Sequence, residues 1–337
     1  MYGVLIFLSS NNATFSSAQT TNRSEADRQA LLCFKSGISG DPGGVLGSWR
    51  EDSLDFCSWR GVNCSTTLPI RVVSLELRSA KIKGQLSSCM VNLTSLVRID
   101  LSSNDLSGSI PEEIGALPSL ETLILDTNRF SGNIPRSLGT AASLRNVNLG
   151  RNALSGVIPV SLAKVPSLRV LVLSMNNLSG EIPVVLFNNA SNLVTERLNF
   201  RGNQISGTIP AAIGNLVNLT QLSMDQNMLS GIIPSAIGNL RKLIVLVLSA
   251  NRLAGEIPST IGDLPQLNQL SLDDNSLSGN IPASLGQCQR LNMLNLSVNN
   301  LDGSIPSEIL SISSLSLGLD LSYNNLTGMI PPPNWKT

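Results

Sequence analysis

One asparagine recurs along this chain at intervals of about 24 residues. An apolar residue stands three positions before it and a proline seven positions after it. The series comprises Asn104, Asn128, Asn152, Asn176, Asn203, Asn227, Asn251, Asn275, Asn299 and Asn324. An earlier, degenerate turn has Leu77 at the apolar position and Ala80 at the asparagine position, so residues 69–331 hold about eleven turns. A unit this short buries its apolar face only against the next unit, and the repeat therefore predicts a solenoid.

Each unit follows the template LxxLxLxxNxLSGxIPxxIGxLxx. The alternating LxxLxL segment predicts a short strand whose leucines point to one side, and stacked strands then form a parallel sheet at a spacing of about 4.8 Å. The asparagine follows the strand, where its amide can satisfy backbone groups that the turn exposes, so these residues are interpreted as a structural ladder. Gly108 and its equivalents permit close contact between coils or a positive φ. Ile-Pro ends the extended segment, and IPxxIGxL returns along the outer face.

The composition argues against several classes of function. The chain has no histidine, which excludes Ser-His-Asp triads, Cys-His nucleophiles and histidine metal sites. Lys+Arg and Asp+Glu are equal at 23 each and aromatic residues make up 4%, which argues against nucleic-acid binding. Asp273 and Asp274 are the only clustered acids we single out, and they do not follow a calcium-loop pattern. We therefore expect no enzyme activity, no cofactor and no metal.

The two ends of the chain carry different signals. The apolar run at residues 2–8 and the small residues Ser16, Ser17 and Ala18 resemble a weak secretory signal over residues 1–18, with a disordered tail as the alternative. No stretch reaches the roughly 18 apolar residues that a membrane span needs. Residues 332–337 are interpreted as a truncated tail.

The repeat closely resembles the plant-type extracellular leucine-rich repeat. The segment EADRQALLCFKSGISGDPGGVLGSWREDSLDFCSWRGVNC resembles the N-terminal cap of plant leucine-rich-repeat receptor kinases, and its wording is similar to a large grass subfamily that includes immune receptors. The resemblance covers residues 25–331. It implies an α/β fold: a right-handed solenoid with a concave parallel sheet, a second short strand around LSGxIP, and a helical, disulfide-bonded cap over residues 24–68. A membrane helix and a kinase domain normally follow in this family, and we expect a truncated ectodomain.

The family cap also bears on the cysteines. Its match makes Cys57 and Cys64 the preferred disulfide, and Cys33 and Cys89 are then predicted to tie the cap to the first coil, although spacing alone leaves the connectivity open. Cys288 is expected to be a half-buried free thiol, with metal binding as the weaker alternative. A helix is expected to begin after Ser24. Its apolar face would comprise Leu31, Leu32, Phe34 and Ile38, with Trp49 and Trp59 on the first coil.

Acceptor triplets for N-glycosylation are frequent, and a secretory interpretation makes several occupied sites the expectation. They begin at Asn22, Asn63, Asn92, Asn177, Asn189, Asn218, Asn295 and Asn325. Asn295 projects from a strand onto the concave face, where a glycan would obstruct a ligand. The fifth turn, from Leu173 to Phe200, spans 27 residues and predicts an outer loop near Asn189, which is either a partner site or drift.

Residues that alternate with the core leucines should line the concave face. Apolar side chains replace the expected polar ones on one strand, next to arginines and acidic residues, which suggests a site for an extended peptide and its carboxylate or sulfate. The alternative is a solvated face with scattered apolar residues. The candidate site comprises Arg151, Val170, Val172, Met175, Arg197, Asn199, Arg201, Ser223, Asp225, Val245 and Val247, with Asp225, Asp273 and Asp274 as an acidic far side.

Two functions remain open. The resemblance implies a secreted or cell-surface recognition module that binds a peptide or protein ligand, often with a co-receptor that has a shorter leucine-rich-repeat ectodomain, in immune or developmental signalling. It would be membrane-anchored only if the product continues beyond Thr337. The alternative is a secreted inhibitor or decoy, similar to plant inhibitors of microbial pectin-degrading enzymes. The paired cysteines that those inhibitors carry at both ends are only half matched here.

Overall fold

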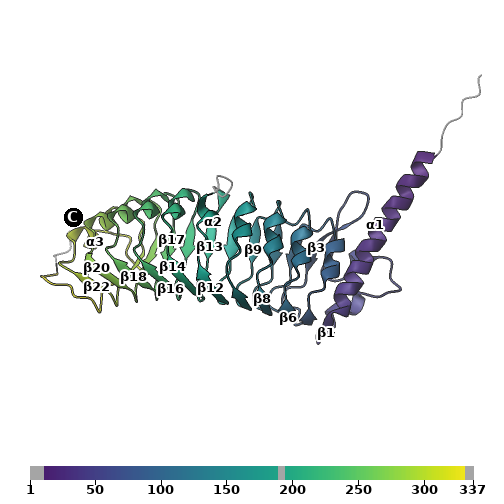
Figure 1. Cartoon of the computed structure of the whole chain (residues 1–337), viewed down its shortest axis with the longest axis horizontal. Helices are drawn as coiled ribbons and strands as arrows, with labels where there is room; N and C mark the ends of the chain where they lie inside the picture. The colour runs from purple at the N-terminus through teal and green to yellow at the C-terminus, as the bar shows by residue number, and fades with distance from the viewer. Residues whose placement is uncertain (1–10, 189–193, 331–337) are drawn as a thin grey trace, which may run out of the picture.

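The computed structural model describes residues 11–188 and 194–330, and of residues 11–22 only the backbone. The chain forms one elongated solenoid, and helix α1 (Asn11–Ser36) projects from its N-terminal end (Figure 1). Two sheets run along the solenoid, one of 12 strands and one of 11, and every pairing between consecutive coils is parallel. The predicted solenoid with a parallel sheet is therefore confirmed.

The 12-stranded sheet is called the concave sheet; it is formed by the LxL segments, with the cap strand Val62–Cys64 added antiparallel at its N-terminal end. Equivalent leucines are in register from coil to coil, as Leu198 and Leu222 show, so they stack into one continuous core. Its strands are β2 (Val62–Cys64), β3 (Val72–Glu76), β5 (Arg98–Asp100), β7 (Thr122–Ile124), β9 (Asn146–Asn148), β11 (Val170–Val172), β13 (Arg197–Asn199), β15 (Gln221–Ser223), β17 (Val245–Val247), β19 (Gln269–Ser271), β21 (Met293–Asn295) and β23 (Gly318–Asp320).

The 11-stranded sheet, called the second sheet, contains the LSG segments, as the family resemblance implies. Its strands are β1 (Ile38–Gly40), β4 (Lys83–Gln85), β6 (Asp105–Ser109), β8 (Arg129–Asn133), β10 (Ala153–Gly156), β12 (Asn177–Glu181), β14 (Gln204–Thr208), β16 (Met228–Gly231), β18 (Arg252–Gly255), β20 (Ser276–Asn280) and β22 (Asn300–Asp302).

Short helices cover the outer side. They are η3 (Ser88–Asn92), η4 (Glu112–Ala116), η5 (Arg136–Thr140), η6 (Val160–Lys164), α2 (Val185–Asn188), η8 (Ala211–Asn215), η9 (Ser235–Asn239), η10 (Ser259–Asp263), η11 (Ala283–Gln287) and α3 (Ser307–Leu310). The 27-residue turn replaces the usual 3-10 helix with α2. The loop predicted near Asn189 lies outside the described residues.

All ten asparagines of the ladder make the same contacts. Asn227 donates from Nδ2 to the carbonyl oxygens of Phe200 (3.0 Å), Met224 (3.0 Å) and Asp225 (3.2 Å), while its Oδ1 accepts from the amide of Ile205 (3.0 Å). One side chain thus satisfies four backbone groups and joins two coils. These hydrogen bonds confirm the structural role predicted for the asparagines. Without them, each unpaired backbone group at such a site would cost about 1–3 kcal/mol.

The glycine of IPxxIG is required by the close approach of neighbouring helices. A Cβ on Gly238 would lie 2.6 Å from the carbonyl oxygen of Thr260 in the next coil, which is closer than real Cβ atoms approach. The glycine is replaced in η3 and α3, where Val91 and Leu310 take its position, and also next to the irregular turn. Ala163 takes the glycine position in the coil before α2, and the buried Phe187 takes it in α2 itself. The outer side is therefore packed differently around this turn.

The cap closes the first coil with two disulfides, Cys33–Cys89 and Cys57–Cys64, and both predicted pairings are confirmed. Inside the cap, Asp27 of α1 is fully buried and accepts from Arg71 Nε (2.8 Å) and Nη2 (2.7 Å). The same carboxylate accepts from the amide of Val72 (2.8 Å), which begins β3. The helix is thereby fixed to the first strand of the concave sheet.

Two predictions about the cap were wrong. Helix α1 begins at Asn11, and Ser24 lies inside it, where its hydroxyl donates to the carbonyl oxygen of Ile70 (2.8 Å). Ile38 lies in β1, after the helix has ended. These errors share a cause, because the bonds and packing involved join segments far apart in sequence.

Candidate ligand-binding face

The register of the concave sheet arranges its surface residues in straight rows across the strands, about 4.8 Å apart. Two rows cross β11, β13, β15 and β17, and each starts and ends with a valine. The first row is Val170, Arg197, Gln221 and Val245, and the second is Val172, Asn199, Ser223 and Val247. The sequence-predicted valines are therefore brought together on one face, as two pairs separated by two polar strands.

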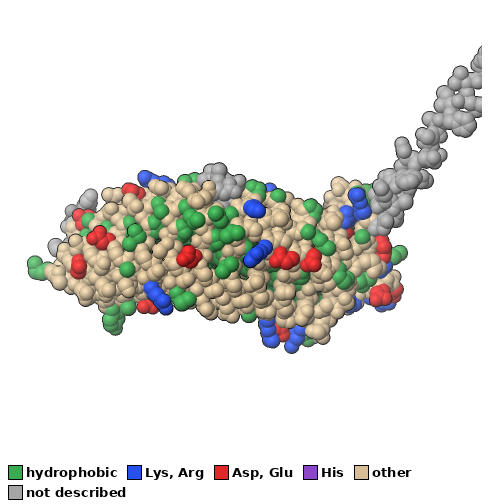
Figure 2. Space-filling view, in the orientation of Figure 1, with side chains coloured by type: hydrophobic (Ala, Val, Ile, Leu, Met, Phe, Trp, Pro, Cys, Tyr) green, Lys and Arg blue, Asp and Glu red, His purple; other side chains and the backbone are tan. Residues whose placement is uncertain are grey.

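The apolar part of this face is partly exposed. The four valines are half-buried, and Met175 is 43% exposed beside β11. Met175 has a positive φ of 56°, and its thioether lies over Gly202 of the next coil, where a Cβ would be 2.6 Å from its sulfur. Ile244, directly before β17, is 45% exposed. Figure 2 shows hydrophobic side chains gathered on the middle of the solenoid, with charged side chains around them.

The two predicted arginines of β13 and its following turn differ in their surroundings. Arg201 Nε lies 3.1 Å from Asp225 Oδ2, so its charge is compensated by the neighbouring coil. Burial raises the pKa of Asp225, and the adjacent Arg201 partly counteracts this. Arg197 is exposed and has no ion pair or side-chain hydrogen bond among the described residues. The two arginines of the candidate site are therefore not equivalent.

The other charges near this face are mostly paired. Arg145 contacts Glu121 (3.4 Å) and Arg169 contacts Glu196 (2.8 Å) along one border of the sheet. Two of the three aspartates of the predicted acidic far side also have side-chain partners. Asp225 is paired with Arg201, and Asp273 accepts from the hydroxyl of Ser249 (2.6 Å). Arg151 lies one coil before Met175, at the equivalent position. It is exposed and has no ion pair within the described part of the chain.

Sequence reasoning missed the backbone conformation of one row of residues. The residue before each ladder asparagine has a positive φ, although only one of the ten, Gly202, is a glycine. Arg151 and Met175 belong to this row, and a non-glycine residue rarely adopts such a backbone. The signal available in the sequence was positional: these residues always precede the asparagine whose amide holds the turn.

The acceptor triplets are distributed unevenly over the surface. Asn63, Asn92, Asn177 and Asn325 are exposed. Asn295 is half-buried on β21, and its Oδ1 accepts from the amide (3.1 Å) and the hydroxyl (2.8 Å) of Ser297. Asn218 accepts from Lys242 Nζ (2.7 Å). Asn189 and the side chain of Asn22 lie outside the described residues.

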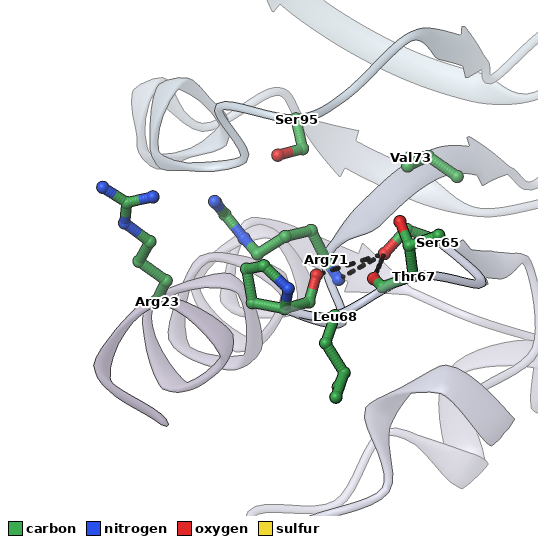
Figure 3. Close-up of a pocket in the computed structure, with 8 residues that line it drawn as sticks. Arg23, Ser65, Thr67, Leu68, Arg71, Val73 and Ser95 are labelled. Carbon is green, nitrogen blue, oxygen red and sulfur yellow. Dashed lines mark hydrogen bonds between the residues drawn. The ribbon is translucent and has the colours of Figure 1, made fainter. Parts of the chain in front are cut away.

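A separate pocket of about 310 Å³ lies where the cap meets the first coil (Figure 3). Arg23, Leu68, Arg71 and Ser95 are among its lining residues, and the hydroxyl of Ser65 accepts from the amide of Arg71 (3.0 Å). The charge of Arg71 is already compensated by Asp27, and the pKa of Arg71 is raised by that contact. We therefore assign this pocket to the junction of cap and solenoid.

Cys288 does not contribute a reactive group. It is fully buried, so the expectation of half-burial was wrong, and its Sγ donates to the carbonyl oxygen of Ile261 (3.4 Å). Burial raises the pKa of its thiol to about 11.

Among the described residues, no group of three or more His, Cys, Asp or Glu could hold a metal ion. No helix in the same residues is long and apolar enough to cross a membrane.

Models of known families match most of the chain. The leucine rich repeat N-terminal domain matches residues 24–65, and a leucine-rich repeat region matches residues 143–317. The leucine rich repeat itself matches residues 95–117, 119–141 and 318–336. A probable leucine-rich-repeat receptor-like serine/threonine-protein kinase of Arabidopsis thaliana is 44% identical over 75 residues, which are 22% of this chain and 7% of that protein.

Two solved structures show the same architecture. The leucine-rich-repeat ectodomain of GASSHO1/SCHENGEN3 from Arabidopsis thaliana, in complex with CASPARIAN STRIP INTEGRITY FACTOR 2, has a TM-score of 0.85 and 37% identity over 92% of this chain and 36% of that one. The Arabidopsis receptor kinase HAESA, in complex with the peptide hormone IDA and the co-receptor SERK1, has a TM-score of 0.79 and 33% identity over 90% of this chain and 50% of that one. This chain thus spans half or less of each.

Proposed function

Because the chain belongs to the leucine-rich-repeat family, we propose that it is an extracellular ligand-recognition module of a plant receptor-like protein. It binds a peptide or protein on its concave sheet and performs no catalysis. A co-receptor with a shorter leucine-rich-repeat ectodomain contacts the complex, and exposed acceptor asparagines carry glycans. The immune or developmental context follows from the identity of the ligand.

The observation that carries this proposal is the face between β11 and β17. Two pairs of half-buried valines flank an exposed, uncompensated arginine, whereas most charges around them are already paired. Partly exposed apolar side chains around a free cation suit a ligand that supplies apolar groups and an anion. HAESA, at 33% identity, was solved with a peptide hormone, which supports the same class of ligand here.

The test is retention of peptides from plant extracellular fluid on the immobilised chain, identified by mass spectrometry. A double variant Val172→Asp/Val247→Asp places charges on the concave face. The control Val157→Asp/Ile232→Asp introduces the same two charges elsewhere on the solenoid, at Val157, which is 53% exposed, and at Ile232, which is 64% exposed. We expect retained peptides to disappear with the first variant and to persist with the second.

Equal retention by both variants would contradict binding on the concave sheet. The inhibitor alternative is tested in the same preparation, by adding the purified chain to a microbial pectin-degrading enzyme. Inhibition of that enzyme together with no retained peptide would replace the proposed function.

A further inference from the structure

We propose that the face between β11 and β17 selects an extended peptide with two apolar side chains four residues apart and an Asp or Glu midway between them. In the notation Φ-x-Asp/Glu-x-Φ, each Φ is an apolar residue and x is any residue. The inference rests on the proposed function and specifies which peptides that function recognises.

The pairing of the strands sets the direction of the ligand. Each strand from β5 to β21 is paired with a neighbour on both sides, so its backbone groups are already used. A ligand on this face is therefore recognised by side chains. The row from Val170 to Val245 runs across the strands, along the solenoid axis, and a peptide that follows it contacts all four coils.

The distance between the two valine pairs matches the rise of an extended peptide over four residues. From β11 to β17 there are three steps of about 4.8 Å, or about 14 Å in total. An extended peptide rises about 3.4 Å per residue, so residues i and i+4 also lie about 14 Å apart, and i, i+2 and i+4 point to the same side. Side chains at i and i+4 then reach the two valine pairs together. A spacing of three residues would turn the second apolar side chain away from the sheet.

The charge of Arg197 sets the residue that the peptide carries between its two apolar side chains. Residue i+2 lies about 7 Å from residue i, which places it between β13 and β15 and over Arg197 and Gln221. Arg197 is exposed and unpaired among the described residues, and a carboxylate there forms a charge-assisted contact. Arg201 is excluded from this role because Asp225 already compensates its charge. A basic residue at i+2 would be repelled by Arg197.

The second row gives each apolar position its width. Val172 lies two residues beyond Val170 on β11, and Val247 lies two beyond Val245 on β17. Alternate residues of a strand are about 7 Å apart, so each valine pair is wide enough to contact a leucine or phenylalanine side chain. Asn199 and Ser223, between the pairs, are polar and do not favour a third apolar anchor.

The experiment is selection from a random heptapeptide display library on the purified full chain. We expect enrichment of Φ-x-Asp/Glu-x-Φ. Binding of a selected synthetic peptide should fall roughly tenfold with Val170→Ser, Val245→Ser or Arg197→Ala. It should change less than about twofold with the controls Val160→Ser and Arg252→Ala, whose side chains are exposed away from this face.

Charge reversal supplies a test that misfolding cannot imitate. Selection on Arg197→Glu should enrich Lys or Arg at i+2 and keep the two apolar positions. If the wild-type chain selects a different motif that still depends on Val170 and Val245, the inference is wrong and the proposed function stands. If no selected peptide depends on the concave face, both are wrong.

Discussion

Arg201 and Asp225 occupy equivalent positions in successive coils, and Arg201 Nε lies 3.1 Å from Asp225 Oδ2 across the concave sheet. The side chain of Asp225 is 7% exposed and that of Arg201 is 50% exposed, so the carboxylate is buried while the guanidinium reaches solvent. Its main consequence is for Arg197. With Arg201 compensated, Arg197 becomes the free cation of β13, and its guanidinium can bind an anionic group of the ligand.

The first prediction is that Arg201→Ala lowers stability in a pH-dependent way. Burial raises the pKa of Asp225, so the stability linked to its protonation is fully present below the ordinary value of 3.8 and is lost as pH rises through the raised pKa. Removing Arg201 raises that pKa further, because its favourable charge is lost. The Tm of the variant should match the wild type near pH 3.5 and lie a few degrees below it at pH 7.

The control is the double variant Arg201→Ala/Asp225→Asn, in which the buried charge is absent and the pH dependence of the difference should vanish. A Tm difference of the same size at both pH values would show that Arg201 stabilises the chain through packing instead.

A second prediction concerns the asparagine ladder. Asn299 donates to three carbonyl oxygens and accepts from the amide of Leu277, whereas its neighbour Asn300 is exposed on β22. Asn299→Ala leaves buried backbone groups unsatisfied and should reduce the free energy of unfolding by about 2–4 kcal/mol. Asn300→Ala should change it by less than about 0.5 kcal/mol. Urea unfolding of both variants measures this, and similar losses would contradict the role of the ladder.

The third prediction tests the close contact between outer helices. Gly238→Ala forces a methyl group to 2.6 Å from Thr260 O and should destabilise the chain by about 1–3 kcal/mol. Gly47→Ala is the matched control, because its Cβ would meet nothing within 4 Å and its φ is not positive. Thermal unfolding compares the two. If Gly238→Ala were as stable as the control, the glycine would not be required by packing.

Much of the fold could be predicted from the sequence, because the repeat exposes the same physical requirement many times. The ladder asparagines were predicted because the same residue follows each strand. The Cys57–Cys64 disulfide followed from the family cap, and Cys33–Cys89 was predicted because these two cysteines remained in the N-terminal region. The start of α1 could not be predicted from Ser24, since its hydroxyl bonds to Ile70 O, 46 residues away. Local capping rules do not detect such a contact.

The candidate face was predicted only in part. Alternation along the strands identified Val170, Val172, Val245 and Val247 as surface residues, and register then placed them in two rows. The pairing of Arg201 with Asp225 depends on the same register, so it could have been predicted from their equivalent repeat positions. The full burial of Cys288 could not, because it depends on how tightly neighbouring coils pack on the outer side.

A fourth prediction follows from that burial. The pKa of Cys288 is raised to about 11 and its side chain has no exposed surface, so it should resist alkylation by iodoacetamide at pH 8 in the folded chain. One thiol should react after unfolding in guanidinium chloride with the disulfides intact. Rapid modification of the folded chain would show that the coils around Cys288 open readily.

The most direct test of the central claim is where a bound peptide lies on the chain. A library-selected peptide would carry a benzophenone photo-cross-linker at one apolar position, and the adducts would be mapped by mass spectrometry. The account predicts adducts on β11 to β17, including Met175, and their loss with Val170→Ser/Val245→Ser. Adducts confined to the second sheet or to the outer helices would contradict recognition by the concave face.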